Sequence, residues 1–116
     1  MSARPRIRTV FFGSPEYAVP TLERLVASPL IDVVLVVTQP DRPRGRRGTP
    51  EPTAVKRIAN REGIPVHQPP RLRRPDTERI ASFAPEVGVV AASGHILPTH
   101  LLEAFPRDVL NVHASL

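Results

Sequence analysis

The fold is decided by two apolar runs near the start of the chain, Ile7-Arg8-Thr9-Val10-Phe11-Phe12 and Ile31-Asp32-Val33-Val34-Leu35-Val36-Val37-Thr38. Both are rich in β-branched and aliphatic residues, and both lack the strict alternation of a half-exposed strand. Such runs are typical of parallel strands that helices cover on both faces. We therefore expect an α/β protein built on a buried parallel sheet.

Helical and strand patterns alternate along the rest of the chain. Apolar residues at the spacing of one helix face follow the first run, at Ala18, Leu22, Leu25 and Val26. Pro20 would break a mature helix, so regular helix is expected to begin near it, after a turn over residues 15–19. Two more helices, the first ended by Gly63, are predicted from Val55, Ile58 and Ala59 and from Ile80, Phe83 and Ala84. A short helix over residues 98–104 and strands over residues 64–67, 86–92 and 108–114 complete the pattern.

This succession predicts a doubly wound parallel sheet in the strand order 3-2-1-4-5, because crossovers between parallel strands are right-handed. Ligands bind such sheets outside the carboxyl ends of the strands, where the order reverses between strands 1 and 4. The residues expected there follow strand 1, follow strand 4 or close strand 5: Gly13, Ser14, Ser93, Gly94, His95, Asn111, His113 and Ser115.

The composition of the 116-residue chain is that of one globular domain, with 41% hydrophobic and 23% charged residues. The absence of cysteine excludes a disulfide scaffold, a thiolate zinc site and a cysteine nucleophile, and it favours a reducing cytosol. The apolar runs are far shorter than the roughly 20 residues that span a bilayer, and residues 1–5 lack the apolar core of a signal peptide. We expect a soluble, intracellular protein.

The net charge of +5 is concentrated in one segment. Residues 41–61 carry the whole excess, because they hold seven cations and two anions: Arg42, Arg44, Arg46, Arg47, Lys56, Arg57 and Arg61 against Asp41 and Glu51. A solvated charged loop is one interpretation of this cluster. A loop that contacts phosphate groups is the other.

Three polar residues share one face of the last predicted strand. Alternation over residues 109–115 places Leu110, Val112 and Ala114 on one face and Asn111, His113 and Ser115 on the other. Because helices cover both faces of a parallel sheet, an amide and an imidazole there need hydrogen-bond partners or a cleft. A satisfied core pair is one interpretation. The position of Asn111 and His113 at the carboxyl end of the strand favours the other, a functional cleft.

The sequence does not support several other binding or catalytic motifs. Gly13-Ser14-Pro15 does not extend into the glycine pattern of a dinucleotide-binding or phosphate-binding loop. Ser93 lacks the glycine two residues earlier that a hydrolase nucleophile elbow needs. No metal is expected, because no ligand spacing relates the four histidines, His67, His95, His100 and His113.

Four segments resemble, in order, the methionyl-tRNA formyltransferase family: FGSPEYAVP at residues 12–20, TQPDRP at 38–43, GHILP at 94–98 and NVHASL at 111–116. The last segment is similar to folate-dependent formyltransferases in general, whereas TQPDRP beside a basic loop is similar to the tRNA-acting branch. The resemblance covers nearly the whole chain. It implies a Rossmann-like formyl-transfer fold and transfer of a formyl group from 10-formyltetrahydrofolate to methionyl initiator tRNA, a step of translation initiation.

The resemblance also implies which residues form the site. Asn111 and His113 would be catalytic and would stabilise negative charge on the formyl oxygen. The folate cosubstrate would contact the loop after strand 4 and the last segment, through Gly94, Ile96, Leu97, Ser115 and Leu116. Ser93 stands where the family commonly has tyrosine, so a shifted pterin contact or an aromatic side chain from elsewhere would have to compensate.

The basic segment matches the family insertion that enters the acceptor end of initiator tRNA. The implied tRNA-binding residues are Arg42, Arg44, Arg46 and Arg47, with Arg46 at the position of the family's key arginine. Arginine binds phosphate through two parallel hydrogen bonds and stacks on unpaired bases, which suits an acceptor end. Gly48-Thr49 replaces a lysine pair that often follows in the family, so the charge of the loop is kept at shifted positions.

The family's catalytic domain is followed by a small tRNA-binding β-barrel domain. The resemblance therefore implies that residues 1–116 are the amino-terminal part of a longer protein. A family aspartate that orients the imidazole lies beyond residue 116, so the chain alone is expected to be inactive. The family further implies that there is no metal, that the full-length protein is a monomer, and that it works in the bacterial cytosol or an organelle matrix.

Two alternatives stay open. Another folate-dependent formyltransferase, or a formyltetrahydrofolate hydrolase, acting on a small molecule would share Asn111 and His113 but would not need the basic insertion. A non-catalytic fragment that binds folate or RNA would show binding without activity.

Overall fold

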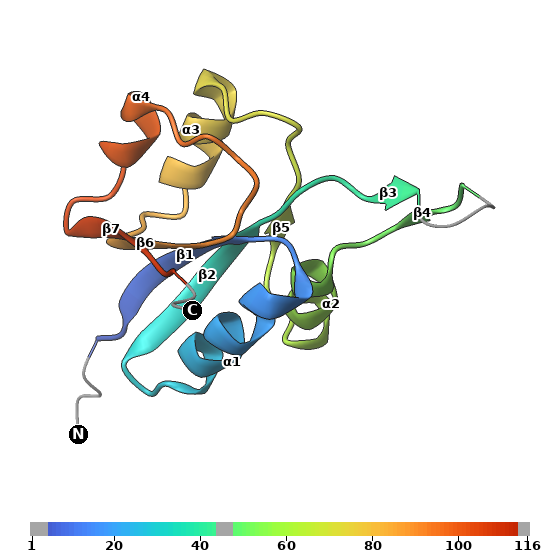
Figure 1. Ribbon diagram of the computed structural model, residues 1–116. Coiled ribbons are helices and arrows are strands. Elements are labelled where there is room, and N and C mark those ends of the chain that lie inside the picture. Colours follow the sequence, from blue (N-terminus) through green and yellow to red (C-terminus); the bar gives the residue numbers. More distant parts are fainter. Residues whose placement is uncertain (1–4, 44–47, 114–116) are drawn as a thin grey trace.

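The computed structural model describes residues 5–43 and 48–113. Its centre is a five-stranded parallel sheet in the order β5-β2-β1-β6-β7 (Figure 1). The strands are β1 (Ile7–Gly13), β2 (Ile31–Val37), β5 (Val66–His67), β6 (Val87–Ala91) and β7 (Asp108–Asn111). These are the five expected strands, so the α/β class and the order 3-2-1-4-5 are confirmed. Five of the predicted site residues lie outside the described residues: Arg44, Arg46, Arg47, Ser115 and Leu116.

The two apolar runs form the buried middle of the sheet. Phe11 and Phe12 of β1 are fully buried, although their side chains point to opposite faces. Phe12 pairs with Val37 of β2 on one side and with Val90 of β6 on the other. Fully burying one such side chain stabilises the fold by about 1.5–3 kcal/mol. The runs are continuous because both faces are covered.

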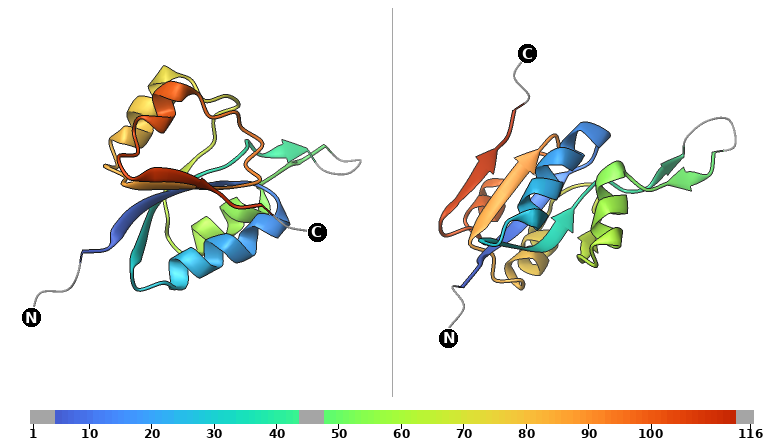
Figure 2. Two further views of the ribbon diagram at one scale, coloured as in Figure 1. Left: turned by 60° about the vertical axis from the view of Figure 1, so that its left-hand side comes forward. Right: turned by 90° about the horizontal axis from the view of Figure 1, so that it is seen from below.

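One face of the sheet is covered by α1 (Val19–Ala27) and α2 (Ala54–Arg61), as Figure 2 shows. Leu22 of α1 and Val55 of α2 are fully buried and belong to one apolar cluster with Phe11. This layer places the start of α2 beside the carboxyl ends of β1 and β2.

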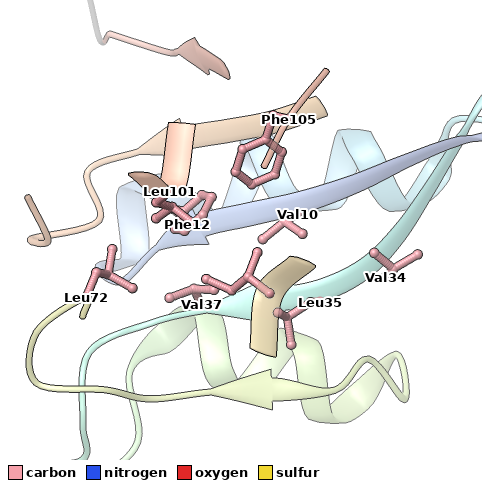
Figure 3. Packing of buried hydrophobic residues seen from close by; sticks show 9 residues of the cluster. Val10, Phe12, Val34, Leu35, Val37, Leu72, Leu101 and Phe105 are labelled. Atoms are coloured by element: carbon pink, nitrogen blue, oxygen red, sulfur yellow. The ribbon is translucent and has the colours of Figure 1, made fainter. Parts of the chain in front are cut away.

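The opposite face is covered by α3 (Arg74–Ala81) and α4 (Thr99–Leu102). Figure 3 shows the apolar side chains of this layer packed over β1 and β2. Leu101 and Phe105 belong to the same cluster as Phe12, and the rings of Phe12 and Phe105 meet edge to face with centroids 6.0 Å apart. Together the two layers make the doubly wound arrangement.

The helix ends follow local signals in α1 and α2. A 3-10 turn over Glu16–Ala18 precedes α1, and Pro20 lies in the first turn, where its missing N–H is not needed. Thr53 caps α2 by accepting from the N–H of Lys56 at 3.1 Å. Gly63 follows α2 with φ +70°, so its predicted role in ending the helix is confirmed.

The two helices on the other face are shorter than expected. α3 ends at Ala81, so Phe83 and Ala84 lie beyond it, and Ala84 adopts the left-handed φ of +51°. Phe83 fits the helical pattern of apolar residues although it is not in the helix, because it packs against the core from the turn that follows. The predicted helix over residues 98–104 is regular only over Thr99–Leu102.

β7 also ends earlier than the predicted residue 114. Its partner β6 ends at Ala91, which leaves no strand to continue the ladder. One further bond extends the pairing, from the N–H of Val112 to the carbonyl of Val90 at 2.7 Å. Among the described residues, no helix has the length and apolarity to cross a membrane.

A β-hairpin that the sequence did not predict projects from the sheet (Figure 1). β3 (Arg42–Pro43) pairs antiparallel with β4 (Pro50–Glu51), on the segment between β2 and α2. The basic segment, residues 41–61, is therefore not one loop, because it includes both the hairpin and α2. Arg42 stands on the hairpin, and the last cations stand on α2: Lys56, Arg57 and Arg61.

Candidate active site

The carboxyl ends of β1, β6 and β7 lie side by side, at the point where the strand order reverses. Gly13 pairs with Ala91, and Val90 pairs with Asn111. The segments that leave these three strands therefore meet at one edge of the sheet, as the strand order predicted.

A surface hollow of about 460 Å³ lies at this edge. Asn111 and His113 both line it, together with Ser93 and Gly94 from the loop after β6. Both side chains are exposed, and within the described part of the chain neither has a hydrogen-bond partner. Within the described chain the two side chains are therefore not a satisfied core pair. An amide and an imidazole free to donate to one ligand atom are what an oxyanion site requires.

Tyr17 is the residue of this hollow that the sequence reasoning missed. It comes from the 3-10 turn before α1, is 69% exposed and lines the same hollow as Asn111. The available signal was that it is the only tyrosine of the chain and lies three residues after Ser14. It supplies an aromatic surface to the hollow that Ser93 also lines.

The loop after β6 is shaped by two residues with left-handed φ, Ala92 at +50° and Gly94 at +75°. Ser93 between them is buried, and its hydroxyl accepts from the N–H of His95 at 3.1 Å. After this turn Ile96 is 90% exposed, whereas Leu97 packs against the core cluster of α3 and α4. Of the predicted folate contacts, the structure brings Gly94 into the hollow and turns Leu97 away to the core.

The root of the hairpin is held by a set of polar contacts. Nε2 of Gln68 donates to Oδ1 of Asp41 at 2.7 Å, and Nζ of Lys56 donates to the same atom at 3.0 Å. These two bonds, the Gln68 bond first, lower the pKa of Asp41 below its ordinary value. Arg42 donates to Oε1 of Gln39 at 3.1 Å. The charge of Lys56 is thus paired with that of Asp41. Arg42 is the described cation that lies on a strand of the hairpin.

A second hollow, of about 330 Å³, lies beside this root. Its lining includes Ser14 and Gln39 from the strand ends, Arg42 and Glu51 from the hairpin, and Thr53 at the start of α2. The two hollows are separated by the contact between Gln39 and the loop after β6, where Nε2 of Gln39 lies 3.5 Å from the carbonyl oxygen of Ser93.

The remaining histidines make contacts inside the protein. A ring nitrogen of His67 lies 2.8 Å from the carboxylate of Asp76, and one of His100 lies 2.7 Å from the hydroxyl of Thr77. A ring nitrogen of His95 lies 2.7 Å from the carbonyl oxygen of Pro69. Among the described residues, no group of three or more histidine or carboxylate side chains is placed to hold a metal ion.

A further hollow of about 440 Å³ lies at the amino ends of β1 and β2, the opposite end of the sheet. Its arginine Arg8 is engaged, because Nε donates to the carbonyl of Phe83 at 2.9 Å and Nη1 lies 3.9 Å from Asp32. None of the polar residues at the carboxyl ends of β1, β6 and β7 lines this hollow. We therefore assign the candidate site to the hollow that holds Asn111 and His113.

The whole chain from residue 6 onward matches one known family. Residues 6–116 match the family model of the formyl transferases. The chain belongs to the formyl transferase family. Within it, the chain is 51% identical over 110 residues to a protein of Heliobacterium modesticaldum named methionyl-tRNA formyltransferase, covering 95% of this chain and 34% of that protein. It is 48% identical over 111 residues to a protein of the same name from Bacillus thuringiensis, covering 95% of this chain and 35% of that protein.

A solved structure of another protein has a similar fold. Glycinamide ribonucleotide transformylase 1 from Symbiobacterium toebii superposes with a TM-score of 0.67 at 19% identity, over 96% of this chain and 53% of that one. At this identity the likeness shows the fold alone. This formyl transferase chain spans about a third of the length of the curated relatives it matches.

Proposed function

We propose that the protein transfers a formyl group from 10-formyltetrahydrofolate to the amino group of methionyl initiator tRNA. The observation that carries the proposal is the exposure of Asn111 and His113 together in one hollow at the strand ends. The names of the relatives support the choice of substrate.

The chemistry of the reaction suits these two side chains. A neutral amino group attacks the formyl carbon, and negative charge then develops on the formyl oxygen. When the carbonyl forms again, the bond from the formyl carbon to N10 of the folate breaks, the attacking nitrogen loses a proton, N10 gains one, and tetrahydrofolate leaves. The amide of Asn111 and the imidazole of His113 are donors for that oxygen, and both lack a competing partner among the described residues. Removing one such donor typically lowers the rate by about 10² to 10³.

The hollow is of a size that suits the reacting end of the folate. Its volume of about 460 Å³ lies within the range of roughly 300–1,000 Å³ typical of small-molecule sites. Gly94 lets the backbone approach the ligand, and Tyr17 offers a ring for the pterin to pack on. Ile96 is the exposed apolar side chain of the same loop. We propose these three as folate contacts, and we extend the proposal to Ser115 and Leu116 from the resemblance alone.

The hairpin is the proposed contact to the tRNA. It projects from the sheet (Figure 2). Arg42 begins its first strand, and the second hollow lies beside it. Arg44, Arg46 and Arg47 belong to the same segment and complete the cluster. A small amine substrate would not need a projecting basic hairpin, which is why we favour the tRNA-linked amine.

The test is a formylation assay of the protein produced at its native length, with 10-formyltetrahydrofolate and methionyl initiator tRNA. The expected product is formylmethionyl-tRNA, with no formylation of glycinamide ribonucleotide and no release of formate to water. The 116-residue chain is assayed in parallel and is expected to be inactive, because the resemblance implies a catalytic aspartate beyond residue 116. Formylation of the small amine alone, or formate release alone, would overturn the proposal in favour of the other enzymes of this fold.

A further inference from the structure

One buried hydroxyl connects the segments that leave three neighbouring strands. Ser14 follows β1 directly and is 8% exposed. Its Oγ donates to the carbonyl of Ser93 at 2.8 Å and accepts from the backbone N–H of Gln39 at 3.1 Å and from Oγ1 of Thr38 at 3.3 Å. A serine hydroxyl has one donor and two acceptor positions, so all three are used. Because β1 lies between β2 and β6, these bonds link the exits of all three strands.

Both ends of the hairpin segment meet at this residue. Gln39 precedes β3 and is held by the Ser14 hydroxyl, while Val55 follows β4 and donates from its N–H to the Ser14 carbonyl at 3.3 Å. A third bond closes the same ring, since the hydroxyls of Thr38 and Thr53 lie 2.7 Å apart. Ser14 is therefore one of the points that fix the hairpin relative to the sheet, beside the contacts of Gln68 and Lys56 to Asp41.

The same hydroxyl holds the loop of the proposed folate contacts. The Ser93 carbonyl that it binds lies between the left-handed residues Ala92 and Gly94. Ser93 and Gly94 line the hollow that contains Asn111 and His113. Ser14 is itself absent from the lining of that hollow and lines the second one instead.

We infer that Ser14 is a positioning residue for formyl transfer. Its hydroxyl fixes the distance between the hairpin that presents the amine-bearing tRNA end and the loop that holds the formyl donor. The inference rests on the proposed function. Reacting atoms must come within about 3–3.5 Å of each other, and a displacement of about 1 Å can cost a hundredfold in rate. Without the hydroxyl, the Gln39 N–H and the Ser93 carbonyl lose their shared partner, and the longer contact from Nε2 of Gln39 to that carbonyl, at 3.5 Å, is left to join the two segments.

The test compares three substitutions in the native-length protein by formylation kinetics. Ser14→Ala removes the hydroxyl and is expected to lower kcat about ten- to a hundredfold, with KM for folate and for tRNA each within about threefold of the unchanged protein. Ser14→Thr keeps the hydroxyl at a residue that lines the second hollow. Its kcat is expected within about threefold of the unchanged protein. Ser82→Ala, which removes an exposed hydroxyl at the end of α3, is the control and leaves kcat unchanged.

Each outcome bears on the inference. A normal kcat in Ser14→Ala, an equal loss in Ser14→Thr, or a rise in KM with normal kcat would each overturn it, because the hydroxyl would then not set the reacting geometry. If Ser14→Ala does not fold, Ser14→Cys keeps the volume with only a weak donor and is expected to show the same fall in kcat. Failure of the unchanged protein to formylate methionyl-tRNA is a separate result, which refutes the proposed function and this inference with it.

Discussion

Gln39 and Gly94 touch across the junction between the hairpin root and the loop after β6. A Cβ atom on Gly94 would lie 3.0 Å from Nε2 of Gln39, and Gly94 itself adopts φ +75°. Two separate costs therefore oppose a side chain at residue 94, one from the backbone and one from its neighbour. The proposed tRNA-binding hairpin and the proposed folate loop meet at this contact.

We expect Gly94→Ala to lower the free energy of unfolding by more than Gly63→Ala does. Both glycines have left-handed φ, which costs an ordinary residue about 1–2 kcal/mol. A Cβ on Gly63 meets no atom within 4 Å, so Gly63→Ala measures the backbone cost alone. Urea unfolding checks the difference, and adding Gln39→Ala to Gly94→Ala should recover the excess. Equal losses in the two single variants would show that the Gln39 contact imposes no constraint.

The sheet could be predicted because burial on both faces leaves a direct trace in the sequence. Phe11 and Phe12 are adjacent, point to opposite faces and are both fully buried, so the run shows no alternation. The hairpin leaves no such trace. Each of its strands has two residues, one of which is proline, and a pattern needs more positions than that.

The candidate site was predictable in part. Alternation along the last strand predicts Asn111 and His113 on one face, and both line one hollow, but Val112 from the other predicted face lines it too, because β7 ends at Asn111. The exposure of Ile96 and the burial of Leu97 were not predictable, because the loop before them turns through a left-handed Ala92 that no propensity favours. The roles of these residues stay predictions.

The salt dependence of tRNA binding tests the role of the basic hairpin segment. Arg46 lies outside the described residues, and its assignment comes from the sequence. Arg46→Ala in the native-length protein is expected to weaken tRNA binding and to lower the slope of log affinity against log salt by about one, with folate affinity unchanged. Arg79→Ala on exposed α3 is the matched control and should leave both unchanged. An unaltered slope in Arg46→Ala would remove this residue from the tRNA contact.

Asp76 gives the fold a defined pH dependence. Burial raises its pKa, but the N–H of Arg73 at 2.7 Å and the ring of His67 outweigh that effect and hold the pKa below its ordinary 3.8. A carboxylate with a lowered pKa contributes stability that is present above the unfolded value and is lost as pH falls through the folded value. Asp76→Asn is therefore expected to cost about 1 kcal/mol at neutral pH, with the difference from the unchanged protein disappearing as the pH falls below 3.8. Urea unfolding at a series of pH values checks this, with Glu103→Gln on the surface as control. A difference that persists in acid would show that the charge of Asp76 is not its cause.

The two polar residues of β7 and its exit provide the sharpest test of the chemistry. Asn111→Ala and His113→Ala should each lower kcat by about 10² to 10³, because each removes a donor to an oxygen that becomes anionic only during the reaction. Binding of methionyl-tRNA should be unchanged, since neither side chain lies on the hairpin. Leu110→Ala is the matched control, because Leu110 is the neighbour of Asn111 in the same strand, is 54% exposed and does not line the hollow. Losses of binding and kcat together would point to a folding defect. Full activity in either Ala variant would mean that the exposed pair at the strand end does not stabilise the reacting oxygen.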